Sequence, residues 1–189
     1  IDGEKMKKEF VIGVTGASGV IYARRLLEVL CDRATVHIVV SDTARQIAGI
    51  EGVDLTGFDA VYAENDNLAA DIASGSFRYD GMAIVPCSMK TLAAVSNGLA
   101  DNLIARAADV CLKERRPLLL LLREMPLSRV HLRNMLAADE AGATVMVASP
   151  PFYQRPATID DLVDMVVARV LDHLGVEHAL GSRWSGYDA

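Results

Sequence analysis

Short apolar runs alternate with helical patterns along the 189 residues of this chain. The runs are rich in β-branched residues or leucine, which favours strands. Between them, apolar residues recur three and four positions apart, the spacing of one helix face. This pattern predicts strands at 10–14, 35–40, 82–86, 118–122 and 143–147, and helices at 21–30, 43–50, 92–96, 103–114, 129–139 and 159–174.

Strands that alternate with helices predict a doubly wound parallel sheet, because parallel neighbours need crossover connections that cover both faces. The five leucines from Leu118 to Leu122 suit an inner strand covered on both sides. Residues 51–79 show only a weak helical hint at 67–72, and we interpret them as an irregular excursion. We expect an α/β fold with a polar extension over residues 1–9 and a single domain over 10–189.

Composition excludes several classes of protein. The 19 Lys and Arg against 25 Asp and Glu give a net charge of −6, which argues against nucleic-acid binding. No apolar run approaches the ~20 residues of a membrane span, and the polar start does not resemble a secretory signal, so we expect a cytoplasmic protein. The three cysteines lack metal-ligand spacing, so we expect no metal and no disulfide framework.

Ligands of doubly wound sheets bind beyond the carboxyl ends of the strands. Thr15-Gly-Ala-Ser-Gly19 follows the first strand and opens a helix, which suits a phosphate; the alternative is a bare turn. The third glycine of a dinucleotide motif is missing, so the turn alone does not choose between flavin and nicotinamide. Arg123 directly follows the leucine strand, where a guanidinium can bind a phosphate; the alternative is a surface ion pair with Glu124.

Each of the other candidate site residues also has a simpler, structural interpretation. The stretch Lys113 to Arg116 is also the basic last turn of a helix. Ser74-Gly-Ser76 is either a contact loop or a solvated turn, and Tyr153 follows two prolines that would hold its ring for binding or for packing. Cys87 has no histidine near it in the sequence, so we expect a buried filler. No tyrosine has a lysine four positions on, which argues against a short-chain dehydrogenase.

Taken in order, these segments resemble the flavin prenyltransferase family, formerly described as a 3-octaprenyl-4-hydroxybenzoate or phenylacrylic acid decarboxylase component. The likeness runs from about Val11 to Trp184. Its specific stretches are Pro86-Cys-Ser-Met-Lys-Thr91 and Leu112-Lys-Glu-Arg-Arg-Pro117. Weaker matches are the Thr15–Gly19 turn, Ser41 with Glu51, Ser74-Gly-Ser76, Arg106-Ala-Ala-Asp109, Arg123-Glu-Met-Pro126, His131-Leu132, Phe152-Tyr153 and Arg169.

The resemblance implies a flavodoxin-like, Rossmann-related flavoprotein that works without a metal. Such a protein joins a dimethylallyl group from dimethylallyl phosphate to N5 and C6 of reduced FMN. It then hands the prenylated flavin to a partner decarboxylase of the UbiD type. The resemblance also implies a homo-oligomer, from trimer to dodecamer, with active sites at subunit contacts. It leaves open whether the donor is a monophosphate or a diphosphate, and which decarboxylase and pathway receive the product.

The family's functional residues map onto this chain in three groups. The implied FMN contacts are Gly16, Ala17, Ser18, Ser41, Ser88, Met89, Lys90, Thr91 and Arg123. The implied prenyl-phosphate site is Lys113, Tyr153 and Arg169 with Arg106, Arg123 and Ser74. The implied catalytic residues are Lys113 and the groups that handle protons, Ser18, Glu51 and Glu124.

The proposed chemistry accounts for these residue types. Breaking an allylic C–O bond leaves phosphate and an allyl cation, so lysine and arginine on the phosphate oxygens stabilise developing charge. Leu122 and Pro151 depart from the family pattern beside Arg123 and Tyr153. Two alternatives remain: an FMN-dependent cysteine decarboxylase, whose Pro-Ala-Ser-Ala-Asn-Thr stretch is absent here, and a non-catalytic FMN carrier.

Overall fold

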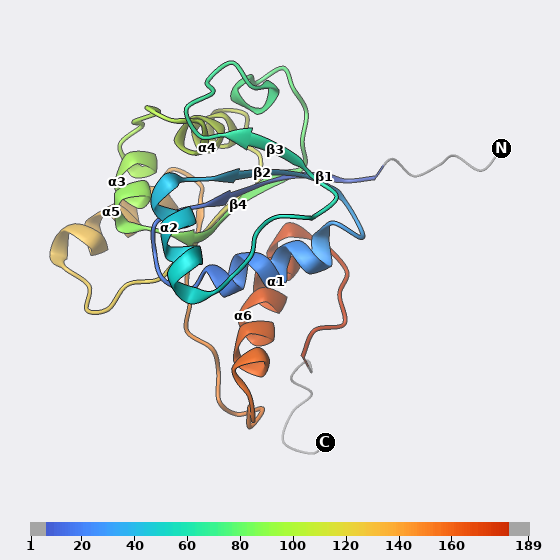
Figure 1. Cartoon of the computed structure of the whole chain (residues 1–189). Helices are drawn as coiled ribbons and strands as arrows, with labels where there is room; N and C mark the ends of the chain where they lie inside the picture. The colour runs from blue at the N-terminus through green and yellow to red at the C-terminus, as the bar shows by residue number, and fades with distance from the viewer. Residues whose placement is uncertain (1–6, 182–189) are drawn as a thin grey trace.

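The computed structural model describes residues 7–181 and contains one parallel sheet with helices on both faces (Figure 1). The six strands lie in the order β3-β2-β1-β4-β5-β6. The strands are β1 (Glu9–Val14), β2 (Thr35–Val40), β3 (Val61–Glu64), β4 (Gly81–Cys87), β5 (Leu118–Leu122) and β6 (Thr144–Val147). The helices are α1 (Val20–Leu30), α2 (Asp42–Glu51), α3 (Met89–Ser96), α4 (Leu103–Lys113), α5 (Arg129–Glu140) and α6 (Ile159–Leu174), with a 3-10 helix η1 at Asp71–Ala73.

The sheet has its topological switch point between β1 and β4. From β1 the chain adds β2 and β3 on one side, then returns to add β4, β5 and β6 on the other. The crossovers leave α1 and α6 on one face and α4 on the other (Figure 1). In β1, Phe10, Ile12 and Val14 pack with the first layer, whereas Val11 packs with the second. The carboxyl ends of β1 and β4 therefore meet where such folds bind ligands.

Helix boundaries follow local capping. The Ser128 hydroxyl accepts the His131 N–H at the start of α5, and the Thr158 hydroxyl accepts the Asp161 N–H at the start of α6. Gly175 ends α6 with φ 64°, a left-handed conformation that glycine adopts without strain. The predicted α/β class, the five predicted strands and the order of the helices are confirmed.

The predicted excursion over residues 51–79 is partly wrong, because it contains the edge strand β3. Three of its four residues are exposed, so it shows neither the apolar run of an inner strand nor a clean alternation. It pairs only with β2, from His37 with Val61 to Val40 with Glu64. The helical hint at 67–72 is also wrong, since only the 3-10 turn η1 forms there.

Strand β1 begins at Glu9, and Trp184, where the resemblance ends, lies outside the described residues. The division into residues 1–9 and 10–189 stays a prediction. Within residues 7–181, no helix is long and apolar enough to cross a membrane.

Candidate functional site

A cavity of about 340 Å³ opens at the carboxyl edge of the sheet, beside the switch point. Its walls come from the segments that follow β1, β2, β3, β4 and β5, so residues far apart in the sequence share it. Seven predicted site residues line it, six of them predicted FMN contacts. The lining comprises Gly16, Ser41, Ser88, Met89, Lys90, Thr91 and Glu124, together with Thr15, Thr43, Asn65, Asn102 and Ile104.

The Thr15 side chain links the ends of β1 and β4 at this cavity by hydrogen bonds. It is 3% exposed, and its hydroxyl donates to the Pro86 carbonyl at 2.9 Å. The same hydroxyl oxygen accepts the Ser88 N–H at 2.8 Å. One buried side chain thus fixes the start of the Ser88–Thr91 segment relative to the glycine turn.

Ser41 and Ser88 cap the two helices that begin at the cavity. The Ser41 hydroxyl accepts the Ala44 N–H of α2, and the Ser88 hydroxyl accepts the Thr91 N–H of α3, both at 3.2 Å. The first N–H groups of a helix have no partner within the helix and carry a partial positive charge. With Lys90 beside them, the walls suit an anionic group such as a phosphate.

The glycine turn lies close to α2 and is crossed by Arg123. A Cβ added at Gly16 would stand 2.6 Å from Thr43 Cγ2, so only glycine allows this approach. Ala17 is buried and Ser18 is exposed. The Arg123 Nε donates to the Ser18 carbonyl at 3.1 Å, which places the guanidinium over the turn. The structure therefore brings Arg123 and the turn together.

The two carboxylates predicted to handle protons lie in different surroundings. Glu51, at the end of α2, accepts the N–H groups of Gly19 and Val20 at 2.8 and 2.9 Å. Its carboxylate therefore occupies the N-terminus of α1. Glu124 lines the 340 Å³ cavity and accepts the Met125 N–H at 3.0 Å. Of these two carboxylates, Glu124 is thus the one that borders the 340 Å³ cavity.

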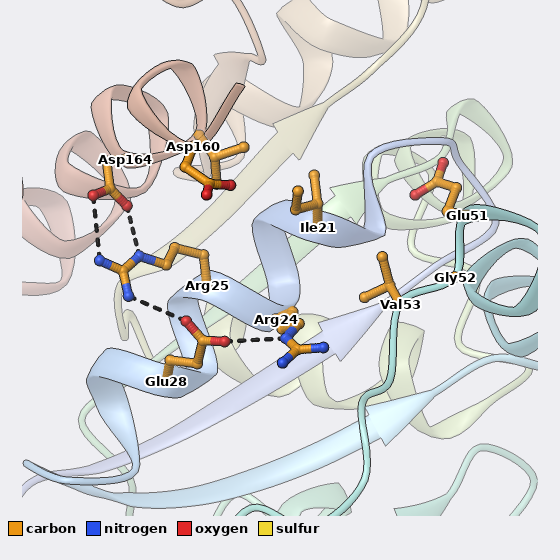
Figure 2. Close-up of a pocket in the computed structure, with 10 residues that line it drawn as sticks. Ile21, Arg24, Arg25, Glu28, Glu51, Gly52, Val53, Asp160 and Asp164 are labelled. Atoms are coloured by element: carbon orange, nitrogen blue, oxygen red, sulfur yellow. Dashed lines mark hydrogen bonds and ion pairs between the residues drawn. The ribbon is translucent and has the colours of Figure 1, made fainter. Parts of the chain in front are cut away.

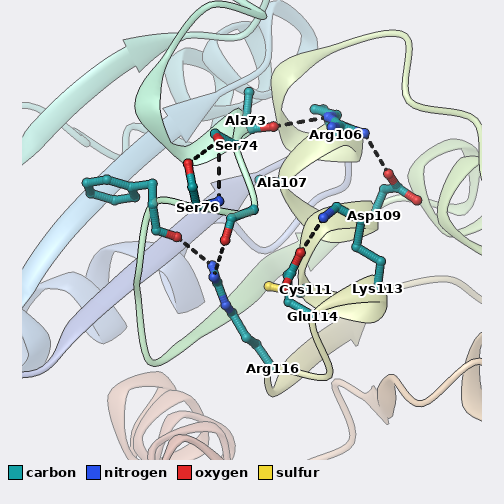
Figure 3. Close-up of polar contacts among 12 residues, drawn as sticks. Ala73, Ser74, Ser76, Arg106, Ala107, Asp109, Cys111, Lys113, Glu114 and Arg116 are labelled. Atoms are coloured by element: carbon teal, nitrogen blue, oxygen red, sulfur yellow. Dashed lines mark hydrogen bonds and ion pairs between the residues drawn. The ribbon is translucent and has the colours of Figure 1, made fainter.

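A second group of predicted residues lies around α4 and the loop before β4 (Figure 3). The Arg106 guanidinium donates to the Ala73 carbonyl at 3.1 Å and to Asp109 at 2.8 Å. Lys113 forms an ion pair with Glu114 and holds the pKa of that carboxyl below its usual range. Helix α4 rises ~1.5 Å per residue, so Lys113 lies roughly 16 Å along it from the end that borders the cavity. Ser74 is exposed on the neighbouring loop.

The third group of predicted residues shares a cavity of about 380 Å³ against α6. Tyr153 and Arg169 line this cavity, whereas Ser74, Arg106 and Lys113 do not. Arg169 donates to Asp172 at 2.7 Å. Within one copy of the chain, the predicted donor residues are therefore divided between separate regions.

A cavity of about 560 Å³ between α1 and α6 contains paired charges (Figure 2). Arg25 contacts Asp164 at 2.6 Å and Glu28 at 3.1 Å. The hydrogen bond with Asp164 raises the pKa of Arg25. Glu51 is the only predicted site residue in the lining of this cavity, and its carboxylate is engaged with the helix α1 backbone. The arrangement ties the two helices together.

Some cavity residues were not predicted from the sequence. Thr15 lies in the predicted turn Thr15–Gly19, but no sequence pattern indicates that its hydroxyl is buried. Asn65 lies in the misread segment, where its side chain accepts the Ile104 N–H at 3.1 Å and its carbonyl accepts the Leu103 N–H. Asn102 caps α4, and an asparagine before an apolar helical run could have indicated it.

Cys87 is fully buried, as predicted, and does not face the cavity as a nucleophile. Burial raises the pKa of its thiol far above the usual range. Burial also raises the pKa of Cys111, to about 11. In the described part of the chain, no three His, Cys, Asp or Glu side chains are grouped to hold a metal ion.

Comparison with known proteins gives the class first. The Flavoprotein family model matches residues 2–171. Together with a phosphate-suited cavity at the switch point, this match makes the chain a flavoprotein.

Curated relatives then identify the particular family. The chain is 46% identical to the flavin prenyltransferase UbiX of Methanocaldococcus jannaschii over 93% of this chain and 98% of that protein. It is 51% identical to the UbiX of Deinococcus radiodurans, over 92% of each. The chain belongs to the flavin prenyltransferase family.

Solved structures agree with this assignment. AnUbiX in complex with FMN and dimethylallyl pyrophosphate has a TM-score of 0.92 at 41% identity, over 96% of this chain and 100% of that chain. A dodecameric FMN-dependent UbiX-like decarboxylase from Escherichia coli O157:H7 has a TM-score of 0.90 at 44% identity, over 94% of this chain and 100% of that chain. An FMN-dependent cysteine decarboxylase shares only the fold, with a TM-score of 0.64 at 16% identity.

Proposed function

We propose that the chain transfers the dimethylallyl group of dimethylallyl phosphate to N5 and C6 of reduced FMN. The observation that carries this proposal is the 340 Å³ cavity, where six predicted FMN contacts meet at the switch point. Family membership and a structural relative that holds both FMN and a dimethylallyl donor support it. The flavin supplies a nucleophilic nitrogen and the ring carbon at which the new ring closes.

The residues around the cavity fit FMN in chemistry as well as in place. The capped starts of α2 and α3, with Lys90, suit its phosphate. Arg123, fixed on the Ser18 carbonyl, is a cation at the mouth of the turn. We assign proton handling to Glu124, which lines the cavity, and to Ser18, whose carbonyl accepts the Arg123 Nε in the adjoining turn.

The donor residues supply positive charge where the departing phosphate develops negative charge. We assign this role to Lys113 and Arg169, with the Tyr153 hydroxyl as a hydrogen-bond donor and with Arg106, Arg123 and Ser74 around them. A dry pocket would keep the allyl cation from water. Glu51, held by two backbone N–H groups, supports the turn and is the further candidate for removing a proton during ring closure.

We infer that the complete site forms between copies of the chain. We call the cavity of about 340 Å³ the flavin cavity. In one copy, Lys113 and Tyr153 lie in different regions, and neither lines this cavity. A relative at 44% identity is dodecameric. Helix α5 also exposes apolar side chains that an assembly would cover, because Val130, Leu132 and Leu136 are 60, 51 and 59% exposed.

The product goes, in this proposal, to a partner decarboxylase of the UbiD type. That step and the cytoplasmic location stay predictions from the sequence. A solved relative holds dimethylallyl pyrophosphate, so the donor test includes the monophosphate and the diphosphate side by side.

The test is anaerobic incubation of the protein with reduced FMN and each donor, followed by mass spectrometry of the flavin. We expect a gain of one prenyl unit. Lys113→Ala and Arg123→Ala should abolish the gain, whereas Arg33→Ala is the matched control, because Arg33 precedes β2 at the opposite edge, where its side chain donates to the Val29 carbonyl. Wild-type rates in both site variants would refute the assigned roles.

The same experiment separates the rival functions. A carrier would bind FMN and leave its mass unchanged. Because one solved relative is named a decarboxylase, carbon dioxide release from an aromatic acid is measured in parallel, and we expect none. Release without a change in flavin mass would replace the proposed function.

A further inference from the structure

The loop from Ser74 to Phe77 is the first part of the connection from η1 to β4, and it lies against the end of α4 (Figure 3). The Ser74 and Ser76 hydroxyl oxygens are 2.8 Å apart, and Ser74 Oγ also accepts the Ser76 N–H at 3.3 Å. These contacts lie within the loop. Two arginines fix the loop relative to the helix: Arg106 of α4 donates to the Ala73 carbonyl directly before the loop, and Arg116 lies beyond α4.

Arg116 holds this loop by its backbone. Its Nη1 donates to the Phe77 carbonyl at 2.9 Å, and its Nη2 donates to the Gly75 carbonyl at 2.8 Å. The guanidinium also lies 4.5 Å from the centre of the Tyr79 ring. Tyr79 is 5% exposed and donates to the Ala107 carbonyl of α4 at 3.2 Å. A planar fork on two carbonyls fixes the loop more narrowly than an ammonium could.

Gly75, whose carbonyl Arg116 holds, lies close to the Lys113 side chain. We call Arg116 with its two carbonyl contacts the clamp. A Cβ added at Gly75 would stand 2.5 Å from Lys113 Nζ and would also contact the Glu114 carboxylate. The Gly75 carbonyl therefore binds Arg116, while the space that a Gly75 side chain would fill is occupied by the Lys113 ammonium. Any shift of the loop changes the space in which that ammonium stands.

We propose that Arg116 is a positioning residue for the prenyl donor, which acts by fixing the Gly75 backbone against Lys113. The inference rests on the proposed function, since Lys113 is there the cation on the donor phosphate. The Arg116 guanidinium is engaged by two carbonyls and an aromatic ring, so it acts through the loop and not on the phosphate itself. The clamp holds Lys113 in place before the donor arrives, which lowers the cost of ordering it on binding.

The main test compares Arg116→Lys with Arg115→Lys. Both changes keep the charge, but within residues 7–181 the Arg115 side chain makes no hydrogen bond or ion pair, and only its backbone N–H is engaged, by the Leu112 carbonyl. We expect Arg116→Lys to raise the donor KM about tenfold, because charge-assisted bonds to the loop are lost. The FMN Kd should stay unchanged, since none of the clamp residues lines the flavin cavity. Arg115→Lys should match wild type in both.

A second variant reaches Lys113 without touching Arg116. Gly75→Ala crowds Lys113 Nζ and should also raise the donor KM while FMN binds normally. An unchanged donor KM in Arg116→Lys overturns the proposal. So does a parallel rise of donor KM and FMN Kd with a fall in Tm, because that describes general unfolding.

A readout without catalysis keeps this inference separate from the proposed function. Hydrogen exchange at residues 74–77 and the acylation rate of Lys113 should both rise in Arg116→Lys relative to Arg115→Lys. If wild type transfers no prenyl group but these differences appear, the proposed function fails while the clamp stands. If wild type is active and neither measurement changes, the clamp fails alone.

Discussion

Thr15 offers the sharpest test of how the flavin cavity is held together. Thr15→Val keeps the shape of the side chain but removes the hydroxyl that joins Pro86 and Ser88. The Pro86 carbonyl still accepts the Thr15 N–H at 3.2 Å, so it keeps a partner. The Ser88 N–H loses its acceptor at a place where the neighbouring strand is buried.

An N–H left without an acceptor in such a place costs roughly 1–3 kcal/mol. We expect Thr15→Val to lower the free energy of unfolding by about 2 kcal/mol, which shifts the urea midpoint by roughly 1 M. Because Ser88 starts the segment that lines the cavity, FMN affinity should also fall, by up to about 30-fold if the whole cost reaches the bound state. Urea unfolding and quenching of FMN fluorescence measure the two effects.

Thr15→Ser is the matched control, since it keeps both hydrogen bonds and loses one buried methyl group. That loss costs about 1 kcal/mol of stability, but it should leave FMN affinity near wild type. The reasoning is refuted if the valine and serine variants bind FMN equally well, or if the valine variant unfolds at the wild-type urea midpoint.

Three further predictions concern backbone space and titration. Gly16→Ala should weaken FMN binding in fluorescence titrations, because the added Cβ would meet Thr43. Its control is Gly49→Ala in α2, where the added Cβ has open space and should raise the free energy of unfolding by about 0.5–1 kcal/mol. Burial raises the pKa of Cys111 from 9.0 to about 11, so the free energy of unfolding should fall as the pH rises from 9.0 towards 11. The fall should be smaller in Cys111→Ala, and equal pH profiles of unfolding in the two proteins would contradict this. Backbone N–H groups lower the pKa of Asp161. The stabilisation that its carboxylate gives the folded state is therefore present at neutral pH and lost below about pH 4, where the free energies of unfolding of wild type and Asp161→Asn should converge. A difference between the two that stays constant with pH would contradict this.

Much of the fold could be predicted because each inner strand has a local signal. Leu118 to Leu122 and the β-branched run of β2 are buried on both faces, so composition alone indicates them. Strand β3 could not be predicted in this way, since it is short, mostly exposed and stabilised by its pairing with β2. Its identity as a strand depends on partners in β2 that lie 24 positions away in the sequence, and not on its own side chains.

The flavin side of the site could be predicted for a similar reason. Ser41 and Ser88 follow strands directly, and the carboxyl ends of parallel strands meet at one edge. Thr15 and Asn65 join that edge through hydrogen bonds over 71 and 39 positions of sequence, which no local pattern contains. Lys113 and Tyr153 were candidates from the sequence, but their role in binding the donor came from the resemblance, and a single copy of the chain does not unite them.

The Glu51 carboxylate on the first N–H groups of α1 bears on which nucleotides the fold accepts. A dinucleotide in a Rossmann fold sets its pyrophosphate against that helix end. Here a fixed negative charge already neutralises the end and repels a second anion. We therefore expect the chain to bind a mononucleotide in preference to NAD or FAD, whose pyrophosphate would meet the Glu51 carboxylate.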